Sequence, residues 1–433
     1  MIPIFNSATE DGKKRLDEVL NRRFEIDQEL ENRVKDILQR VATQGDKALI
    51  EYTRQFDSPE FSLENLKVQE SEIERSYEAV SEDFLKALRK AKANIEEFHK
   101  LQLPKSWFMT KDDGSILGQR VTPVDGAGLY VPGGQGGKTP LVSSVLMNGI
   151  PAKIAGVERI VLVTPPSQDC SASPHLLVAA NEVGISEIYK VGSAWAIAAL
   201  AFGTESIKPV DVIVGPGNIF VTIAKKLVSG RVGIDMVAGP SEILVIADDS
   251  AKAEFVAADL LSQAEHDAMA TSILLTTSED LAKGVCKELE QQLRELSRAE
   301  VAEKSLRENG LLMVVGSLEE AAQIANRLGP EHLELMIKDP WQLMPMIKHA
   351  GALFLGNYTP EPIGDYIAGP NHVLPTMGTA RFSSALSVDT FLKRTSILNY
   401  SKKAFDQDAA DVILLAEVEG LSAHARSIEI RKK

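Results

Sequence analysis

Two side chains that commonly bind metal ions or polar substrates lie one helical turn apart near the middle of the chain. Gln263 and His266 belong to the run QAEHD, which follows an apolar segment. If residues 255–266 form a helix, Asp259, Gln263 and His266 share one side of it, within roughly 60° of arc. A metal ion or a polar substrate fits such a face, and so does a plain helix end whose histidine is only hydrogen-bonded. The segment alone leaves both interpretations open.

Two later segments also place acids near imidazoles. Glu331 directly precedes His332 after an expected helix, a pairing suited to activating water or moving protons, although a turn with a surface acid gives the same pattern. Asp365 and His372 lie in residues 362–375, a segment stiffened by proline and glycine, and loops of this kind often carry function.

A glycine-rich stretch at 114–140 and a turn at 215–218 are candidates for contacting a flat ligand. Seven glycines lie between Gly118 and Gly137, without the spacing of the phosphate loop of nucleoside triphosphatases. The stretch is either a turn-rich crossover or a backbone wall for a ligand, with Tyr130 available to stack or hydrogen-bond. The turn at 215–218 keeps only the first two glycines of the dinucleotide fingerprint, so by itself it is weak evidence for NAD.

Composition restricts the classes of protein to which the chain can belong. It has 433 residues, 44% of them hydrophobic, enough for a sizeable core in two or more domains. A net charge of -14 and a pI near 5.2 argue against nucleic-acid or acidic-membrane partners. No apolar run spans a membrane and the start does not resemble a secretory signal, so we expect a cytoplasmic protein. Cys170 and Cys286 are too few for a disulfide framework.

Strand-like and helical patterns alternate over some 200 residues, which predicts a largely parallel sheet arrangement covered on both faces. Ligands in such folds bind at the carboxyl ends of strands, so the residues after each apolar run are the ones to examine. Residues 29–56 and 71–101 have helical spacing, whereas residues 1–25 are polar and irregular and are expected to form an arm. The expected strands are 159–165, 187–193, 210–218, 242–248, 271–277, 311–317 and 352–356.

Eight short motifs together resemble the histidinol dehydrogenase family over nearly the whole chain. The combination is far more specific than any single motif. In order they are GLYVPGG, GPGN, AGPSE, QAEHD, GPEH, GDY, GPNHVLPT and EGL followed by a histidine three residues later.

The resemblance implies NAD-dependent oxidation of L-histidinol through L-histidinaldehyde to L-histidine, with one zinc ion per subunit and a homodimer. It implies two incomplete Rossmann-like α/β domains with parallel sheets, one from 26–128 and 241–378 and an NAD-binding one from 129–240. Arms at 1–25 and 379–433 would serve dimerisation, the C-terminal arm completing the partner's site. The implied zinc ligands are Gln263, His266, Asp365 and His424. The implied proton-transfer residues are Glu331 and His332. The implied substrate contacts are Ser241, His372 and Glu419, with the zinc ligands and His332. The implied NAD contacts are Tyr130 and Asn218.

Residue chemistry agrees with this interpretation at two points. Two imidazoles, an amide oxygen and a carboxylate leave zinc positively charged, with room for a substrate's imidazole and amine nitrogens. Neither cysteine lies in a motif, so the second oxidation is expected to use an aldehyde hydrate made by water that Glu331 activates, with His332 as general base.

One departure affects the cofactor side. The family usually has a glutamine in the run GGAQA that contacts NAD, and here the run is GSAWA with Trp195 at that position. An indole cannot accept a hydrogen bond, although it can stack on the cofactor. The NAD contact at Trp195 is therefore uncertain from sequence.

Three other interpretations stay open. A zinc alcohol dehydrogenase of the same fold acting on another small polar alcohol would share the metal and proton-transfer residues, but Glu419 would repel an anionic substrate. A zinc hydrolase could use Glu331 and a metal-bound water without NAD. A non-catalytic nucleotide-binding scaffold would leave the four zinc-ligand candidates unexplained.

Overall fold

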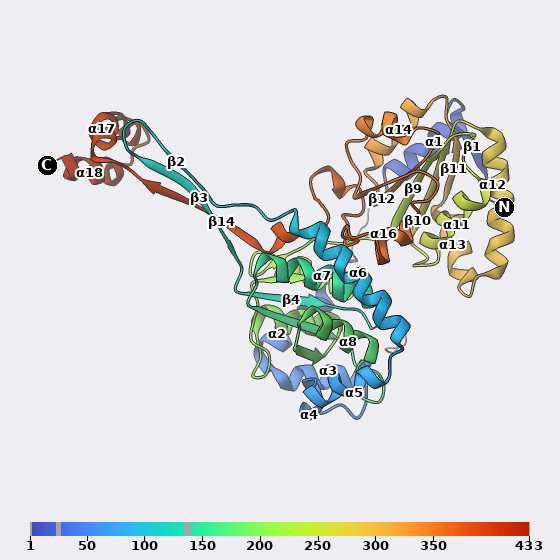
Figure 1. Ribbon diagram of the computed structural model, residues 1–433, viewed down its shortest axis with the longest axis horizontal. Helices are drawn as coiled ribbons and strands as arrows, with labels where there is room; N and C mark the ends of the chain where they lie inside the picture. The colour runs from blue at the N-terminus through green and yellow to red at the C-terminus, as the bar shows by residue number, and fades with distance from the viewer. Residues whose placement is uncertain (1, 23–26, 134–139, 433) are drawn as a thin grey trace. The chain divides into compact units, whose positions relative to one another are not determined.

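The computed structural model describes residues 2–22, 27–133 and 140–432. Contacts divide the chain into two compact units. Unit 1 comprises residues 1–102 and 125–391 and holds two parallel sheets; unit 2 comprises residues 103–124 and 392–433. The two parallel sheets confirm the expected α/β fold class (Figure 1). No helix in the described part of the chain combines the length and the apolar character needed to cross a bilayer.

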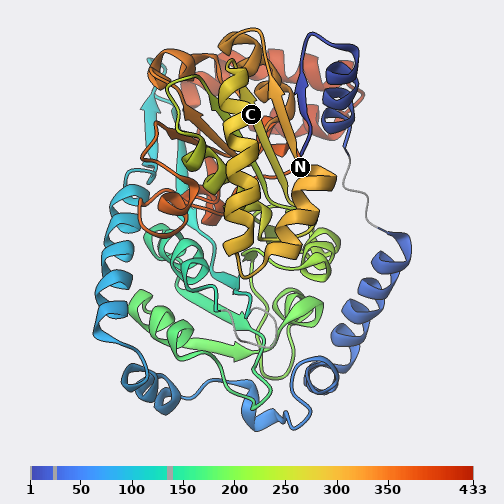
Figure 2. The ribbon, with the colours of Figure 1, turned by 90° about the vertical axis from the view of Figure 1, so that its right-hand side faces the viewer.

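The larger sheet of unit 1 has six parallel strands in the order β1-β11-β10-β9-β12-β13. Alternate residues of β9 enter different cores, because successive side chains of a strand point to opposite faces. Ile243 and Val245 pack with α11, α12 and α13, whereas Leu244 and Ile246 pack with α1 and α14. Figure 2 shows the helices of residues 279–309, in yellow, in front of this sheet. The strands are β1 (Ile4–Asn6), β9 (Glu242–Ala247), β10 (Thr271–Thr276), β11 (Leu311–Val314), β12 (His332–Met336) and β13 (Ala352–Leu355). The helices are α1 (Glu10–Leu20), α11 (Ala253–Ala264), α12 (Glu279–Gln292), α13 (Ala299–Asn309), α14 (Leu318–Leu328), α15 (Pro340–Leu343) and α16 (Glu361–Tyr366).

The described N-terminal residues form part of the larger sheet, and the expected part of residues 1–25 in dimerisation stays a prediction. Strand β1 pairs with β11, and α1 buries Leu16 and Val19 in the core under β10 and β11 (Figure 1). The apolar pattern was too short to reveal this, because β1 has three residues and is an edge strand.

The smaller sheet of unit 1 has five parallel strands in the order β6-β5-β4-β7-β8. Its central strand lies in the glycine-rich stretch, part of which was expected to be a crossover. The part of that stretch at 134–139 lies outside the described residues. The strands are β4 (Gly126–Tyr130), β5 (Arg159–Thr164), β6 (Glu187–Lys190), β7 (Val212–Val214) and β8 (Gly233–Ile234). The helices that follow them are α7 (Val142–Ala155), α8 (Pro174–Val183), α9 (Ser193–Phe202) and α10 (Ile219–Val228).

The helices of residues 28–78 pack with the smaller sheet, whereas helix α6 also contacts residues 367–371, where Asn94 Nδ2 donates to the Ile367 carbonyl at 2.7 Å. Val34, Val41, Leu49 and Phe61 share a core with Tyr130 and with strands and helices of residues 161–232. Helix α6 contacts α7, and α5 contacts α8. The domain division that the resemblance implies therefore differs from the packing of these helices. These helices are α2 (Gln28–Gln44), α3 (Asp46–Phe56), α4 (Leu63–Leu66), α5 (Glu70–Glu78) and α6 (Glu82–Lys100).

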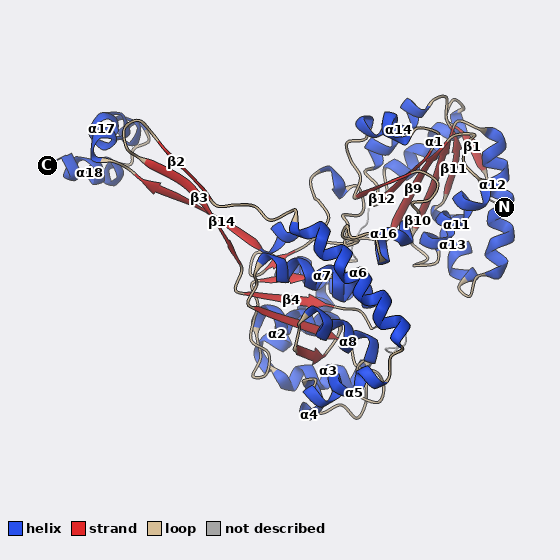
Figure 3. Ribbon diagram, in the orientation of Figure 1, coloured by secondary structure: helices blue, strands red, loops and turns tan. Residues whose placement is uncertain are grey.

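Unit 2 is a three-stranded antiparallel sheet carrying two helices. Strand β3 (Ile116–Pro123) lies between β2 (Trp107–Thr110) and β14 (Leu392–Asn399), followed by α17 (Lys402–Val418) and α18 (Ser422–Glu429) (Figure 3). The expected C-terminal arm therefore starts later than 379 and includes a hairpin from residues 103–124 that sequence reasoning did not assign to it. Eight residues of β14 pair with eight residues of β3 in an antiparallel register, so the hairpin supplies the backbone hydrogen-bond partners of β14.

Candidate active site

Most of the expected site residues of unit 1 line one cavity of about 220 Å³. The larger sheet and its helices supply one wall and the smaller sheet supplies the other. From the expected residues the lining includes Ser241, Gln263, His266, Glu331, His332, Asp365 and His372. From the smaller sheet it includes Gly215, Pro216, Gly217, Lys225 and Asp235.

The larger sheet contributes the amino ends of its strands to the cavity, contrary to the expectation that carboxyl ends hold the ligand. Ser241 directly precedes β9, and His332 is the first residue of β12. In a parallel sheet with crossover helices, the carboxyl ends of the helices gather at this edge; here α11 ends at Ala264 and α14 at Leu328. The negative ends of helix dipoles favour a cation there.

The smaller sheet contributes its carboxyl edge, as expected. Its strand order reverses between β4 and β7, and such a switch point opens a crevice for ligands. Gly215 ends β7 with φ +115°, and a Cβ there would lie 2.1 Å from the carbonyl oxygen of Tyr130, so only glycine fits. Helices α9 and α10 begin at this edge, and their positive ends suit phosphate groups.

A buried ion pair fixes the turn that follows β7. Lys225 pairs with Asp235, and both side chains are almost inaccessible, at 3% and 1% exposure. The Lys225 ammonium also donates to the Gly215 carbonyl at 2.9 Å, and Asp235 accepts from the Gly215 N–H at 2.8 Å. Both backbone polar groups of Gly215 are thus held by one charged pair, which sequence reasoning missed because the partners are ten residues apart and not on one element.

Glu331 and His332 are held by the backbone of a single residue. The Glu242 N–H donates to Glu331 Oε2 at 2.9 Å, and His332 Nδ1 lies 2.9 Å from the Glu242 carbonyl oxygen. A carbonyl only accepts, so Nδ1 carries the proton and Nε2 has a free lone pair. Burial lowers the pKa of His332 and raises that of Glu331 well above its usual value. The neutral imidazole is therefore the stable form, as a general base requires.

The metal candidates of unit 1 meet in this cavity. Helix α11 ends two residues before the expected end, and the His266 N–H bonds the Gln263 carbonyl as the chain leaves the helix. Gln263 is 1% exposed, and its Oε1 has no hydrogen-bond partner in the described part of the chain. A buried amide oxygen without a donor is costly unless a cation or a substrate group completes it. The donor set therefore fits a zinc ion.

Asp365 and Glu361 extend the site from α16, one turn apart on one helix face. The ligand atoms of His332, Glu361 and Asp365 all lie within 4.8 Å of one another. Glu361 is buried, and sequence reasoning missed it because the proline- and glycine-rich segment begins at residue 362. The spacing of four residues between Glu361 and Asp365 could have indicated that the two acids share one helix face. Burial, with Glu361 beside it, raises the pKa of Asp365 to about 8.

Asp259 does not line this cavity. Its carboxyl group hydrogen-bonds Glu334 on β12, and burial raises the pKa of Asp259 to about 6. Glu334 Oε1 accepts from the Glu361 N–H at 2.9 Å, at the first residue of α16. The pair thus anchors the helix that presents Asp365.

His372 lies against the same acid. Its Nδ1 is 3.7 Å from Asp365 Oδ1, and burial lowers the pKa of His372 to about 4. Ser241 also belongs to the lining, and its carbonyl accepts from the Thr271 N–H at 3.0 Å. Both are placed to contact a substrate in the cavity.

The expected NAD contacts lie at the carboxyl edge of the smaller sheet. The Tyr130 hydroxyl accepts from the N–H of Ser193 at 3.1 Å, and burial raises the pKa of Tyr130 to about 12. Asn218 caps α10 through its side-chain oxygen. Trp195 is buried and stacks against Tyr52 and Phe56, with ring centroids 5.6 Å away in each case. Its Nε1 has no partner among the described residues.

Glu419 and His424 belong to unit 2. Glu419 caps the end of α17 and His424 lies in α18, and both are exposed. Their part in the site stays a prediction.

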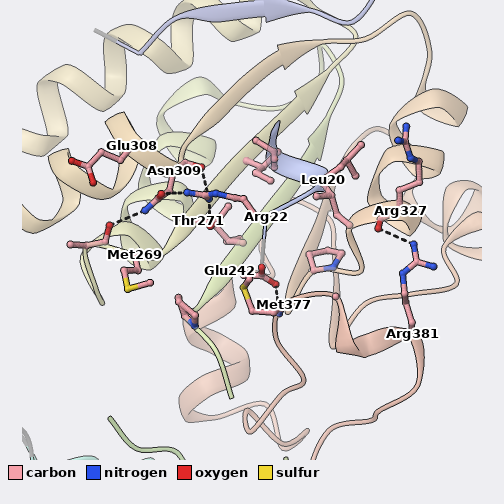
Figure 4. A pocket seen from close by; sticks show the side chains of 18 of the residues that line it. Leu20, Arg22, Glu242, Met269, Thr271, Glu308, Asn309, Arg327, Met377 and Arg381 are labelled. Carbon is pink, nitrogen blue, oxygen red and sulfur yellow. Dashed lines mark hydrogen bonds between the residues drawn. The ribbon is translucent and has the colours of Figure 1, made fainter. Parts of the chain in front are cut away.

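A second cavity of about 440 Å³ is lined by the side chain of Glu242 (Figure 4). The Glu242 carboxylate accepts from the Met377 N–H at 3.1 Å, and burial raises its pKa to about 7. Arg22 hydrogen-bonds Asn309 and Thr271 across the cavity. Glu242 thus orients Glu331 and His332 through its backbone, and the hydrogen bond of its side chain with Met377 holds Glu242 itself in place.

Comparisons with known proteins identify the family. The family model described as histidinol dehydrogenase matches residues 20–432. Histidinol dehydrogenase of Desulfotalea psychrophila is 57% identical over 427 residues, 98% of both chains, and that of Carboxydothermus hydrogenoformans is 54% identical over 420 residues, 97% of this chain and 98% of the other. The crystal structure of histidinol dehydrogenase from Elizabethkingia anophelis matches with a TM-score of 0.92 and 38% identity, covering 99% of this chain and 98% of that one. The chain therefore belongs to the histidinol dehydrogenase family of oxidoreductases.

Proposed function

We propose that this protein carries out the NAD-dependent, zinc-requiring four-electron oxidation of L-histidinol through L-histidinaldehyde to L-histidine. One observation carries the proposal: the base-competent His332 and the acid Glu331 line the same cavity as the unsatisfied Gln263 oxygen. The glycine turn expected to contact NAD lines that cavity as well.

Gln263, His266 and Asp365 would hold zinc, with His424 as a fourth ligand. Bound there, zinc would supply a positive charge that fixes the imidazole and amine nitrogens of the substrate. The carboxyl end of α11 suits that charge. Ser241, His372 and Glu419 would complete the substrate contacts, and the Glu419 carboxylate favours a cationic substrate over an anionic one.

His332 serves as general base in the first oxidation. Its Nε2 lone pair takes the hydroxyl proton of histidinol, and NAD+, when bound, would accept the hydride of the carbinol carbon, giving the aldehyde and NADH. The hydrogen bond from Nδ1 to the Glu242 carbonyl keeps the ring in this tautomer and orientation.

The second oxidation uses water and Glu331. His332 first returns to its neutral form by releasing the proton of the first step to solvent. The Glu331 carboxylate then takes a proton from a water molecule that adds to the aldehyde carbon, and His332 accepts the remaining hydroxyl proton of the hydrate, whose hydride a second NAD+ would accept. A thiol adduct is disfavoured: Cys170 lies beside Ser58 and Cys286 beside Ile2, outside the cavity lining. Both thiols are unpaired, which supports a place in the reducing cytoplasm.

The dinucleotide would lie at the switch point of the smaller sheet, against Tyr130 and Asn218 and near the start of α9. Trp195 has little exposed surface and is already stacked, so any contact with NAD would be made by the ring edge that carries Nε1. That edge can donate a hydrogen bond but not accept one.

A homodimer is proposed in which unit 2 of one subunit completes the site of the other. Its exposed apolar side chains support a protein partner, because a surface with this many exposed apolar groups is costly in water. These side chains are Trp107, Phe108, Met109, Leu398, Leu414, Leu415 and Val418.

Mixing two inactive variants tests the shared site. His424→Ala and His332→Asn homodimers should each be inactive. If His424 acts across the interface, dissociation and reassociation of the mixture should restore roughly a quarter of the wild-type sites, since each heterodimer has one intact site. No recovery in confirmed heterodimers would place His424 in its own subunit's site or outside the mechanism.

The reaction is tested by counting NADH formed per histidinol consumed, with histidine identified as product. A ratio near two supports the proposal. A ratio near one without histidine would favour the alternative, a related dehydrogenase that stops at the aldehyde or acts on another small polar alcohol.

A further inference from the structure

His332, Glu361 and Asp365 form a compact group of nitrogen and oxygen donors that is distinct from the zinc-ligand set proposed above. Their ligand atoms all lie within 4.8 Å of one another. His332 and Glu361 are 4% and 3% exposed. Only Asp365 is shared with the proposed zinc ligands, and a carboxylate has a second oxygen to offer.

The free nitrogen of His332 points to a ligand. Nε2 is buried and has no hydrogen-bond partner in the described part of the chain. Nδ1 is engaged by the Glu242 carbonyl, so Nε2 presents its lone pair, the tautomer that binds metal ions.

Three carboxyl groups surround that nitrogen. Glu331, Glu361 and Asp365 all line the cavity, and only Asp365 is assigned to zinc. Glu361 shares a side-chain hydrogen bond with Asp365, and Ser262 Oγ lies 3.4 Å from its Oε2. Neighbouring buried carboxyl groups ionise together only at a high cost, and a divalent cation beside them would offset that cost.

We propose that His332 Nε2, Glu361 and Asp365 form a second, weaker divalent-cation site, which takes up zinc in excess and thereby blocks the lone pair that the general base needs. One imidazole and two carboxylates suit zinc better than magnesium or calcium, which prefer oxygen ligands alone. Two-metal sites bridged by one acid place their ions about 4 Å apart, a separation compatible with a shared Asp365. The inhibitory effect rests on the proposed function; the binding does not.

Calorimetric titration of the one-zinc enzyme with zinc alone tests the binding. Wild type should take up one further zinc per subunit. Glu361→Gln should weaken that event by at least ~100-fold, because even changes outside the ligand shell cost about 10- to 100-fold in metal affinity. Glu254→Gln, an exposed acid on α11, is the matched control and should bind as wild type does.

His332→Asn guards against a folding defect in the Glu361 variant. Asparagine can still donate to the Glu242 carbonyl but has no atom at the Nε2 position, so the second event should again be lost while the first zinc and the melting temperature are kept. No second uptake by wild type, or equal second uptake by wild type and Glu361→Gln, would overturn the site.

Activity assays test the consequence. Excess zinc should inhibit wild type, and residual turnover of Glu361→Gln should resist zinc by the same factor as its binding is weakened. Inhibition that is equal in both enzymes would overturn the proposed blocking of His332. Because the calorimetry needs neither histidinol nor NAD, failure of the proposed reaction would be seen separately.

Discussion

Replacing Glu331 by glutamine should separate the two oxidations. The carboxylate accepts a 2.9 Å hydrogen bond from the Glu242 N–H, and an amide oxygen can accept the same bond. The amide cannot take a proton from water. His332 keeps its own bond to Glu242, so the first hydride transfer retains its general base.

The size of the effect follows from the loss of one general base. Such a group contributes about 10²- to 10⁴-fold, which corresponds to roughly 3–5 kcal/mol in the barrier of the second step. With histidinol limiting, the first NADH should form at a nearly normal rate and the second should be delayed by that factor. Histidinaldehyde should accumulate between the two phases.

Rapid-mixing measurement of NADH, with the aldehyde trapped by semicarbazide, gives both rates. Glu308→Gln is the control, since this acid is exposed and lines the second cavity. Equal slowing of both phases, or two NADH formed at the normal rate, would refute the assignment of Glu331 to the second step.

Acidification should have a related effect on wild type. Glu331 must be charged to act, and its pKa is raised well above 4.5 by burial, so the second oxidation fails as the pH drops through that raised value. His332 must be neutral, and burial lowers its pKa, so its neutral form extends to lower pH than that of a free imidazole. The rate of the second NADH phase should therefore fall as wild type is acidified. In Glu331→Gln this part of the pH dependence should be absent.

Three further predictions concern the metal and stability. His266→Ala should lose zinc by metal analysis, and full zinc retention would contradict its role as a ligand. Lys225→Met should lower the free energy of unfolding by about 3–5 kcal/mol, because Asp235 is left buried without its cation. Denaturation in urea measures this loss. The double variant Lys225→Met with Asp235→Asn should recover part of it. Asp57→Asn should stabilise the fold above pH 7, by at most about 4 kcal/mol, because burial raises the pKa of Asp57 to about 7 from 3.8 and the charged form is disfavoured in the folded state. That gain should disappear as the pH falls toward 4, and a melting-temperature difference independent of pH would contradict it.

Local sequence patterns were sufficient to predict the strands with a strong hydrophobic pattern. The strands expected at 159–165, 242–248 and 271–277 appear within a residue or two of their expected bounds, since continuous apolar runs between turn residues predict buried parallel strands. Weaker signals were missed. Strand β1 is too short to show a pattern, and β4 consists largely of glycine and small residues, which sequence reasoning attributes to turns.

The site residues likewise comprise some that the sequence predicted and others that only the structure revealed. Residue types and spacing picked out Glu331, His332, Gln263 and Asp365, and the resemblance assigned them roles. Spacing could not place these residues at the amino edge of the larger sheet, because the usual rule for α/β folds favours the carboxyl edge. It also missed Glu361 and the Lys225–Asp235 pair, whose importance depends on burial.

The sequence by itself determined the family, the chemistry of the candidate groups and most of the parallel strands, because these depend on residue identity and short-range periodicity. Only the tertiary structure decided which backbone orients His332, where α11 ends, and which acids are buried together. The orientation of His332, for example, arises from a contact between Glu242 and His332, which lie 90 residues apart, and no local pattern encodes the distance at which two buried charges meet.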